Sequence, residues 1–197
     1  MSRPAVFFNN NGTLVRPLTA DLDLRRVELM PGALDAAQTL NRAGFALVVV
    51  ANHSGIAHGS YSEEAVLDMS ERVHQLLAQG GVPLDGYYFC PHHPGGTLSR
   101  YAISCLCRKP APGLLIRAAQ ELDLDLRRSW MVGGPADVEA GHRVRLLTIL
   151  HTNGIIPPHS PGLARDPDYL ATSIVDAART IRGVSSSYPF AAVPRGA

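Results

Sequence analysis

Short apolar runs alternate with amphipathic segments along the first 150 residues of the chain. The runs are rich in Val, Leu and Phe and lack the polar alternation of a half-exposed strand, so they indicate strands covered on both faces, as in a parallel sheet. The predicted strands are residues 5–8, 45–50, 86–89, 130–132 and 146–150. Each ends in a polar or glycine-containing segment.

Helical spacing fills the intervals between these strands. Pro31-Gly32 opens a segment that stops at Gly44, and Ser62 precedes an apolar series at three- and four-residue spacing. The predicted helices are 31–44, 62–77, 112–122, a short one before residue 146, and 173–181. Alternating strands and helices predict an α/β fold with a doubly wound, mostly parallel sheet and active loops at the carboxyl ends of the strands.

Length and composition favour a single domain. The chain has 197 residues, of which 46% are hydrophobic, enough to fill one substantial core. We expect one domain over residues 1–182 and a flexible tail over 183–197, where serines and prolines gather.

The charge balance excludes some partners. Lys plus Arg number 18 and Asp plus Glu number 17, so we expect neither nucleic acid nor membrane as a partner. No apolar run is long enough for a spanning helix, and the N-terminus lacks the pattern of a signal peptide. We therefore expect a cytoplasmic protein.

All three cysteines lie in one polar insert, residues 90–107, which predicts a metal-binding loop. Cys90 and His92 form one short pair, and Cys105 and Cys107 form another. Three thiolates and one imidazole suit tetrahedral zinc, and a complete set of four ligands indicates a structural ion. His93 is a competing imidazole that the sequence does not exclude.

Three stretches carry a resemblance to a known family: "GFALVVVANHSGIAHG", "LDGYYFCPHHPGG" and "CLCRKPAPG". With them the chain resembles the haloacid dehalogenase (HAD) superfamily, and within it the D-glycero-D-manno-heptose 1,7-bisphosphate phosphatases, to which histidinol-phosphate phosphatases are related. The resemblance implies a Rossmann-like sheet of HAD type with a zinc loop and no large cap domain. It also implies a Mg²⁺-dependent phosphatase that acts on a phosphosugar in nucleotide-heptose synthesis.

The first catalytic loop of the family reads Asp-x-Asp-Gly-Thr, and this chain departs from it at both acids. The family's first Asp attacks phosphorus and its second protonates the leaving oxygen. Those positions hold Asn9 and Asn11. An amide is a poor nucleophile and has no carboxyl proton to give, so both roles are lost together.

Two further loops also depart from the family. Ala51 stands where a Thr hydroxyl would hold the phosphoryl group, and Gly134 stands at a Mg²⁺ carboxylate position. The later acid of that motif is either Val138 or a displaced Asp137. Since Mg²⁺ prefers anionic oxygens in a regular octahedron, we expect no tight Mg²⁺ site.

The phosphate-gripping part of the family's site is retained. The resemblance assigns phosphate contacts to Asn52, Ser54, Arg108 and Lys109, joined by the backbone amides of the first loop. With the acids absent, an anion could bind without metal, so loss of catalysis does not imply loss of binding.

Three hypotheses follow. The first is a pseudoenzyme that keeps the fold and zinc and binds a phosphosugar, phosphate or a protein partner as a regulator. The second is a working sugar phosphatase that recruits Asp137 or another acid. The third is a structural subunit with an empty cleft. A replacement nucleophile at His53 or His58 is disfavoured, because most loop histidines do no chemistry.

Overall fold

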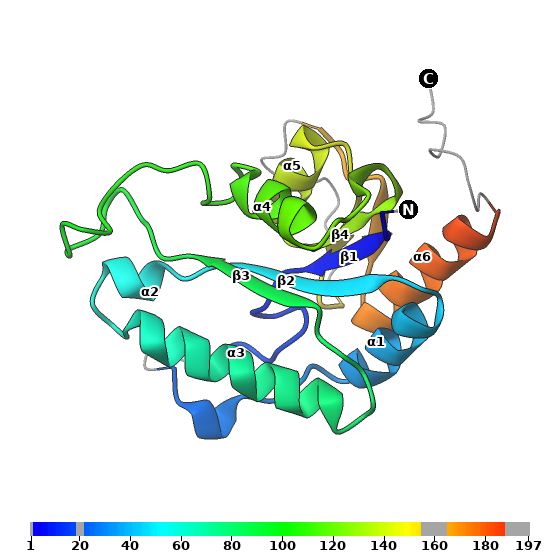
Figure 1. Cartoon of the computed structure of the whole chain (residues 1–197), viewed down its shortest axis with the longest axis horizontal. Helices are drawn as coiled ribbons and strands as arrows, with labels where there is room; N and C mark the ends of the chain where they lie inside the picture. The colour runs from blue at the N-terminus through cyan, green and yellow to red at the C-terminus, as the bar shows by residue number, and fades with distance from the viewer. Residues whose placement is uncertain (1, 19–21, 155–164, 188–197) are drawn as a thin grey trace.

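The architecture is a six-stranded sheet with helices on both faces (Figure 1). The computed structural model describes residues 2–18, 22–154 and 165–187. The sheet order is β3-β2-β1-β4-β5-β6, and each neighbouring pair is parallel. The strands are β1 (Ala5–Phe8), β2 (Ala46–Asn52), β3 (Gly86–Cys90), β4 (Trp130–Gly133), β5 (Leu147–His151) and β6 (Tyr169–Ala171). The predicted doubly wound α/β fold of HAD type is confirmed, with no large cap among the described residues.

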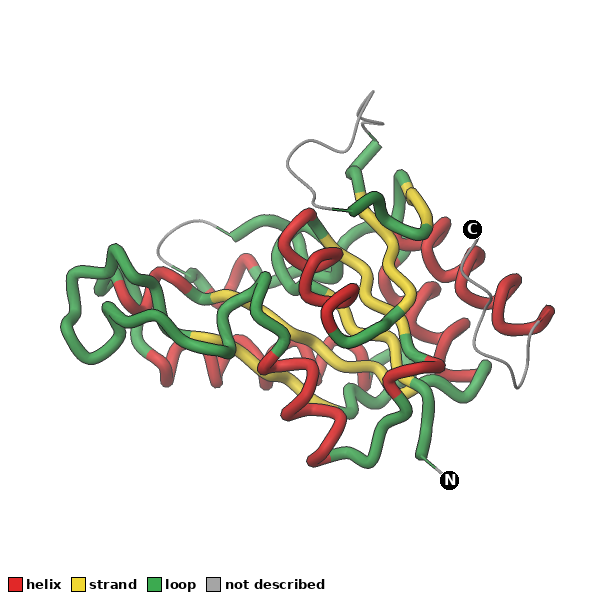
Figure 2. The backbone as a smooth tube through the Cα atoms, turned by 90° about the horizontal axis from the view of Figure 1, so that it is seen from above, coloured by secondary structure: helices red, strands yellow, loops and turns green. Residues whose placement is uncertain are grey.

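Alternate residues of the central strands enter two separate hydrophobic clusters. Val6 and Phe8 of β1 belong to one cluster and Phe7 to the other. The helices α1 (Ala33–Arg42), α3 (Glu63–Ala78) and α6 (Ile174–Ser187) pack on the first face, and α4 (Gly113–Glu121) and α5 (Pro135–Arg143) pack on the second. Figures 1 and 2 show the sheet between these two layers. Burial on both faces explains why the strands read as continuous apolar runs.

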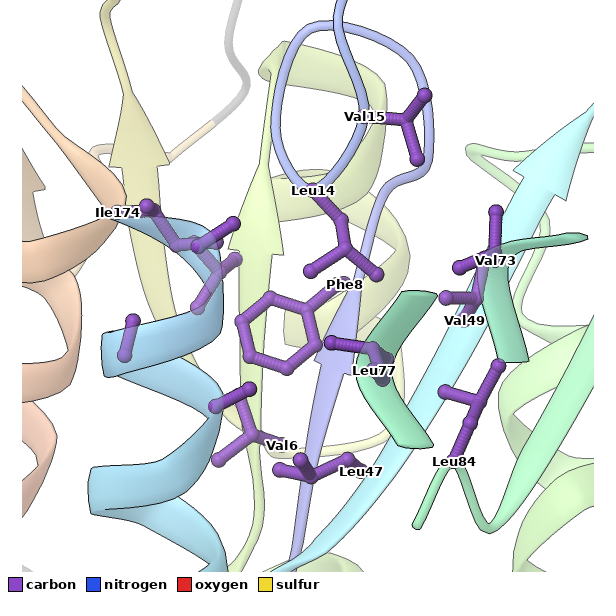
Figure 3. Close-up of a cluster of buried hydrophobic side chains, with 14 of the residues drawn as sticks. Val6, Phe8, Leu14, Val15, Leu47, Val49, Val73, Leu77, Leu84 and Ile174 are labelled. Atoms are coloured by element: carbon purple, nitrogen blue, oxygen red, sulfur yellow. The ribbon is translucent and has the colours of Figure 1, made fainter. Parts of the chain in front are cut away.

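The loop after β1 is anchored in the core. Leu14 and Val15 from this loop join the same cluster as Phe8, beneath the carboxyl end of the sheet (Figure 3). Both side chains are almost fully buried. The loop that carries Asn9 and Asn11 is therefore held in place by apolar packing on its far side.

The predicted helix start at Ser62 corresponds to a side-chain cap. The Ser62 hydroxyl accepts a hydrogen bond from the backbone N–H of Ala65 at 3.2 Å, and Glu63 and Glu64 lie in the first turn of α3. A side-chain cap and acids near the amino end of a helix both stabilise it. The local sequence and the observed helix agree here.

Short elements escaped the sequence analysis. These are α2 (Ser54–Ala57), the 3-10 turns Leu24–Arg26 and Leu126–Arg128, and the edge strand β6. Three or four residues carry too little periodicity to be recognised.

The expected tail boundary at residue 183 needs correction. Helix α6 continues through Gly183 to Ser187. The hydroxyls of Ser186 and Ser187 donate to backbone carbonyls of Arg182 and Gly183 within this last turn, which lets the serines remain helical. Residues 188–197 of the expected tail lie outside the described residues, and the remainder of the domain assignment stays a prediction.

Candidate functional site

Three neighbouring strands end at one edge of the sheet and bring the predicted site residues together. Asn9 follows β1, Asn52 ends β2, and Gly134 follows β4. The backbone N–H of Asn9 donates to Val132 O at 3.0 Å, which fixes the start of the first loop against β4. The strand order reverses between β1 and β4, and ligands bind at such a point in sheets of this kind.

Lys109 lies at the centre of this edge, and its ammonium group is fully engaged. Its Nζ donates to Asn9 Oδ1 at 3.1 Å and to Val50 O at 2.6 Å, and it forms an ion pair with Asp137. The residue is 5% exposed. Since an ammonium group has three donors, no N–H of Lys109 remains free in this arrangement.

Asn52 holds the backbone of Lys109 in place. Its Nδ2 donates to Lys109 O at 3.0 Å, and its Oδ1 accepts from Lys109 N at 3.1 Å. The side-chain amide of Asn52 thus bonds both the N–H and the C=O of Lys109, as the backbone of a paired strand would. These two bonds use Oδ1 and one of the two N–H donors of Nδ2, which leaves one amide donor for the predicted contact with phosphate.

Asp137 is placed by the amino end of α5. Its Oδ2 accepts the backbone N–H of Gly134 at 2.8 Å, while Oδ1 forms the ion pair with Lys109. A Cβ on Gly133 would overlap this carboxylate, so the glycine permits the close approach. Both residues of the ion pair are buried, so the positive charge of Lys109 is compensated locally.

The residues present do not fit a Mg²⁺ ion. Asn9 Oδ1 accepts from Lys109, and Asn11 Oδ1 accepts the backbone N–H of Leu18 at 2.9 Å. The carboxylate of Asp137 is committed to Lys109 and to Gly134. Mg²⁺ requires several hard oxygens around one point, and here an ammonium group occupies the position between the oxygens.

Arg108 links the cleft to the zinc loop. Its Nη1 donates to Ser54 Oγ at 2.9 Å and to His92 O at 3.1 Å. Ser54 is the first residue of α2 and lies two residues after Asn52, the last residue of β2. Among the predicted phosphate contacts, these two side chains are hydrogen-bonded to each other, whereas Lys109 is buried and bonded elsewhere.

The first loop uses its own backbone donors. The N–H of Gly12 donates to Val15 O at 2.8 Å, and that of Thr13 donates to Asn10 O at 3.4 Å. The structure therefore gives the predicted anion-binding amides internal partners.

A cavity of about 240 Å³ opens beside these loops. It is lined by Asn9, Asn10, Asn11, Leu18, Leu22, Ala51, Asn52, His53, Gly55, Ser60 and Tyr61. Burial lowers the pKa of His53 to about 4, with the nearby Lys109 charge as a second cause, so the ring is neutral at pH 7. Among the described residues, no lining side chain carries a charge at that pH.

His53 lies in a row with two tyrosines. Its Nδ1 lies 3.2 Å from the Tyr61 hydroxyl, and its Nε2 lies 3.2 Å from the Tyr87 hydroxyl. The Tyr61 ring covers Gly55, where a Cβ would overlap it. Burial raises the pKa of both tyrosines, so each keeps its proton. This arrangement orients the Tyr61 hydroxyl at the cavity wall, and the sequence offered no signal for it.

The cysteines converge on one point with His92. The Sγ atoms of the cysteines are separated by 3.0 to 3.5 Å, and His92 Nδ1 lies 3.3 Å from Cys107 Sγ. Tetrahedral zinc with Zn–S bonds of about 2.3 Å places sulfurs about 3.8 Å apart, so a small expansion of the cluster would accommodate the ion. The set Cys90, His92, Cys105 and Cys107 is the one group of its kind in the described part of the chain.

The geometry favours His92 over His93 as the fourth ligand. His93 Nδ1 accepts the backbone N–H of Gly95 at 3.1 Å, and its ring contacts that of His58. Burial raises the pKa of the Cys90 thiol in the metal-free protein, so a bound cation is required to hold it as a thiolate. The residues present therefore fit zinc.

Comparison with known proteins gives first the class and then the family. A HAD-hydrolase-like family profile matches residues 106–177. A crystal structure from Mesorhizobium loti described as a HAD-like phosphatase is 35% identical, with a TM-score of 0.78 over 93% of this chain and 88% of the other. The fold and the strand-end loops thus define a HAD-like protein.

The curated relatives narrow this class. The D-glycero-β-D-manno-heptose-1,7-bisphosphate 7-phosphatase of Yersinia pestis is 37% identical over 92% of this chain and 96% of its own length, and that of Escherichia coli K12 is 35% identical over 92% and 95%. The chain belongs to this phosphatase family.

A more distant structure shares the fold. The D,D-heptose 1,7-bisphosphate phosphatase of B. bronchiseptica, crystallised with magnesium and phosphate, is 24% identical, with a TM-score of 0.78 over 92% of this chain and 99% of the other. The magnesium and phosphate are properties of that protein.

Proposed function

We propose that this chain is a pseudoenzyme of the heptose-bisphosphate phosphatase family, which binds a phosphosugar without Mg²⁺ and does not hydrolyse it. In the family pattern, covalent phosphoryl transfer uses a carboxylate nucleophile and a carboxyl acid. Their positions hold the amides of Asn9 and Asn11.

The observation that carries the proposal is the hydrogen bonding of these amides. Asn9 Oδ1 accepts from Lys109 Nζ, and Asn9 Nδ2 donates to Asn11 O at 3.0 Å. The amide therefore has its oxygen toward the cation and its nitrogen toward the loop backbone. An amide oxygen in this setting is a weak nucleophile, and Asp137 is paired with the same ammonium group and is not positioned as a replacement acid.

Zinc in the loop that follows β3 is part of the proposal. The four clustered ligands leave no position for water or substrate, so the ion would order the loop and would take no part in chemistry. Arg108 hydrogen-bonds to the carbonyl of His92, and an ordered loop would hold that guanidinium at the rim of the cleft.

An active phosphatase is the second candidate function, because the relatives carry the name of that enzyme. Proteins 37% and 35% identical over most of this chain carry the name of an active phosphatase. A working phosphatase would have to recruit an acid, and Asp137 is the carboxylate nearest to Lys109.

Phosphate release separates the two functions. The chain is incubated with D-glycero-β-D-manno-heptose 1,7-bisphosphate and Mg²⁺, and free phosphate is measured while intact mass is monitored for a phosphorylated chain. We expect no release above the rate without protein and no mass increase. Release that Asn9→Ala abolishes would establish the active phosphatase.

A variant with the family's residues restored tests the scaffold. It carries Asn9→Asp, Asn11→Asp, Ala51→Thr and Gly134→Asp. Turnover in this variant, with none in the parent chain, would localise the loss of activity to these positions. A variant that binds zinc and folds but stays inactive would place the loss elsewhere.

A further inference from the structure

A groove of about 510 Å³ runs along one outer edge of the sheet. Its floor is Gly86–Phe89 of β3, which Figure 1 shows as the outer strand, with α3 on one side and α4 on the other. Helix α3 contributes Glu63 and Leu67, and α4 contributes Arg117 and Glu121. Leu67 is 57% exposed here. The groove therefore has an aromatic floor, an exposed leucine on one wall and charges on its rim.

The backbone of β3 has hydrogen-bonding groups that face this groove. Cys90 O accepts the N–H of His53 at 2.9 Å, so the backbone of Cys90 is directed toward β2. Because successive residues of a strand direct their backbone groups to opposite sides, Tyr88 also faces β2, whereas Tyr87 and Phe89 face outward. Among the described strands, β2 is the only partner of β3. The N–H and C=O groups of Tyr87 and Phe89 are therefore available to another strand.

Strand β3 lacks the features that usually protect an edge. No charged residue and no proline lies within Gly86–Cys90, and Pro91 follows only after the last residue of the strand. The opposite edge strand, β6, has three residues and follows residues 166–168, which are two acids and a proline. Charges, proline and short length all discourage a further strand from pairing with an edge. Of the two edges, that of β3 is therefore the one open to strand addition.

We infer that the partner on this edge is a second copy of the chain, whose β3 pairs antiparallel with β3 about a twofold axis at Tyr88. In this register Tyr87 of one copy lies opposite Phe89 of the other, and each such pair exchanges both of its hydrogen bonds. The two copies of Tyr88 form the closely spaced pair between them, with Cα atoms about 4.5 Å apart. The inference goes beyond the proposed function and does not depend on it.

The side chains on one face of this edge are complementary to themselves. Tyr87 and Phe89 pack against the first hydrophobic cluster, on the face covered by α3. The twofold axis would place the Tyr87 ring of each copy opposite the Phe89 ring of the other, and aromatic cross-strand pairs stabilise antiparallel strands. Leu67 extends from α3 on the same face and would be covered in part by the second copy.

The charges on the other face are also complementary to themselves. Arg117 Nε donates to Glu121 Oε1 at 2.8 Å, and the guanidinium lies over the Tyr88 ring, 5.7 Å from its centroid. The side chains of Arg117 and Glu121 are 66% and 48% exposed. An axis at Tyr88 brings one arginine and one glutamate from each copy together, so ion pairs can form across the axis with no net charge. A neutral rim of this kind favours a second copy over a strongly charged peptide.

Sedimentation velocity on the full chain with zinc, from about 1 to about 100 μM, tests the inference. We expect the mass to rise with concentration from one chain to two and to stop there, because a twofold interface is closed. A single-chain mass over the whole range overturns the inference, even if a peptide of another protein binds the groove. Growth beyond two chains overturns it as well, because open-ended growth requires a different contact.

Two substitutions locate the interface. Tyr88→Glu places two carboxylates opposite each other at the axis, and Leu67→Glu adds a charge to each wall. Each should raise the dissociation constant of the dimer about tenfold or more. Leu170→Glu is the matched control, because Leu170 is a 48% exposed leucine on the other edge strand, and it should leave the constant unchanged.

The zinc content and the circular dichroism spectrum show whether each of these variants folds. If Tyr88→Glu does not fold, Leu67→Glu still decides, because it lies at an exposed helix position. Unchanged dissociation in the folded variants of the β3 edge would overturn the inference, and so would weakened association in Leu170→Glu.

Exchange of the rim charges separates contacts across the axis from contacts within one chain. Arg117→Glu and Glu121→Arg each present like charges to a copy of the same variant, so each alone should associate severalfold more weakly. An equimolar mixture of the two variants should recover association, because each chain then meets the opposite charge. A role confined to one α4 would not respond to mixing. A mixture as weakly associated as its components would therefore overturn the proposed pairing.

Discussion

The zinc loop and the cleft lie side by side, yet they treat their ligand positions differently. In the loop, all four metal-ligating side chains are present and their donor atoms lie within 4.8 Å of one another. In the cleft, the carboxylates of the family pattern are replaced by amides, and the amides are hydrogen-bonded to the cation that remains. The donor atoms of the loop converge on one point, whereas the oxygens of Asn9 and Asp137 in the cleft converge on the ammonium group of Lys109.

The difference concerns how each kind of site responds to the loss of a side chain. A structural metal site loses its ion when a ligand is lost, because the remaining thiolates have no other partner. A reaction site can lose its acids and still fold, because Lys109 finds three acceptors in Asn9, Val50 and Asp137. The cleft therefore holds amides at the two family acid positions without leaving the buried charge of Lys109 unpaired.

The largest expected effect is loss of the metal site. His92→Gln should lower the zinc content from about one ion per chain toward zero and destabilise the protein by several kcal/mol, since structural zinc contributes about 10–16 kcal/mol in small peptides. Metal analysis and thermal unfolding measure this. His93→Gln is the matched control and should retain zinc. A metal-free preparation with unchanged thermal stability would contradict the assignment.

The buried ion pair of the cleft should give the next largest effect. Lys109→Met leaves the Asp137 carboxylate buried without its partner, which costs about 3–5 kcal/mol. Urea unfolding measures this change. The double variant Lys109→Met/Asp137→Leu should recover part of the loss, because it leaves no unpaired charge. A single variant as stable as the parent would show that the pair is weak.

The third largest expected effect is the loss of stability when His53 is protonated. Its pKa is lowered from 6.5 to about 4, so the neutral ring contributes stability that is complete above pH 6.5 and is lost as the pH falls toward 4. The lost stability is about 3 kcal/mol. His53→Gln should lack this component, and the exposed His74→Gln should follow the parent. All three chains carry the same zinc ligands, so their difference isolates His53. Parallel pH curves for His53→Gln and the parent would refute the prediction.

The smallest expected effect concerns the contact between the two regions. Ser54→Ala removes the acceptor of one Arg108 hydrogen bond and should destabilise the protein by about 0.5–1.5 kcal/mol. Ser70→Ala on α3 is the control and should change stability by less than about 0.5 kcal/mol. The midpoints of urea unfolding, compared between chains with equal m-values, measure the stability change in both variants. A null result at Ser54 would mean that Arg108 is held by the loop carbonyl alone.

Much of the fold could be predicted because its strands are buried on both faces. The run at 45–50 has no polar interruption, and β2 places each of its residues up to Ala51 in one of the two clusters. The convergence of the three cysteines with His92 was also predictable, since all of the cysteines lie in one insert, whereas zinc in this cluster remains a prediction. Strand β6 was missed because three residues carry no periodic signal.

The internal partners of the site residues could not be predicted. The resemblance assigned Asn52 and Lys109 to phosphate, but the sequence does not show that the Asn52 amide pairs with the Lys109 backbone. Nor does it show the pairing of Asp137 with Lys109, since the two are separated along the chain and meet only because β4 lies beside β1. Whether these residues contact a ligand remains a prediction.

The Asn52 amide has one further consequence. Because it fixes the main chain of Lys109, the depth of the ammonium group depends on an uncharged side chain at the end of another strand. A substitution that removes the Asn52 amide would leave the main chain of Lys109 without these two hydrogen bonds. Any redesign of this cleft toward anions therefore has to begin at the tip of β2, where no charged residue lies.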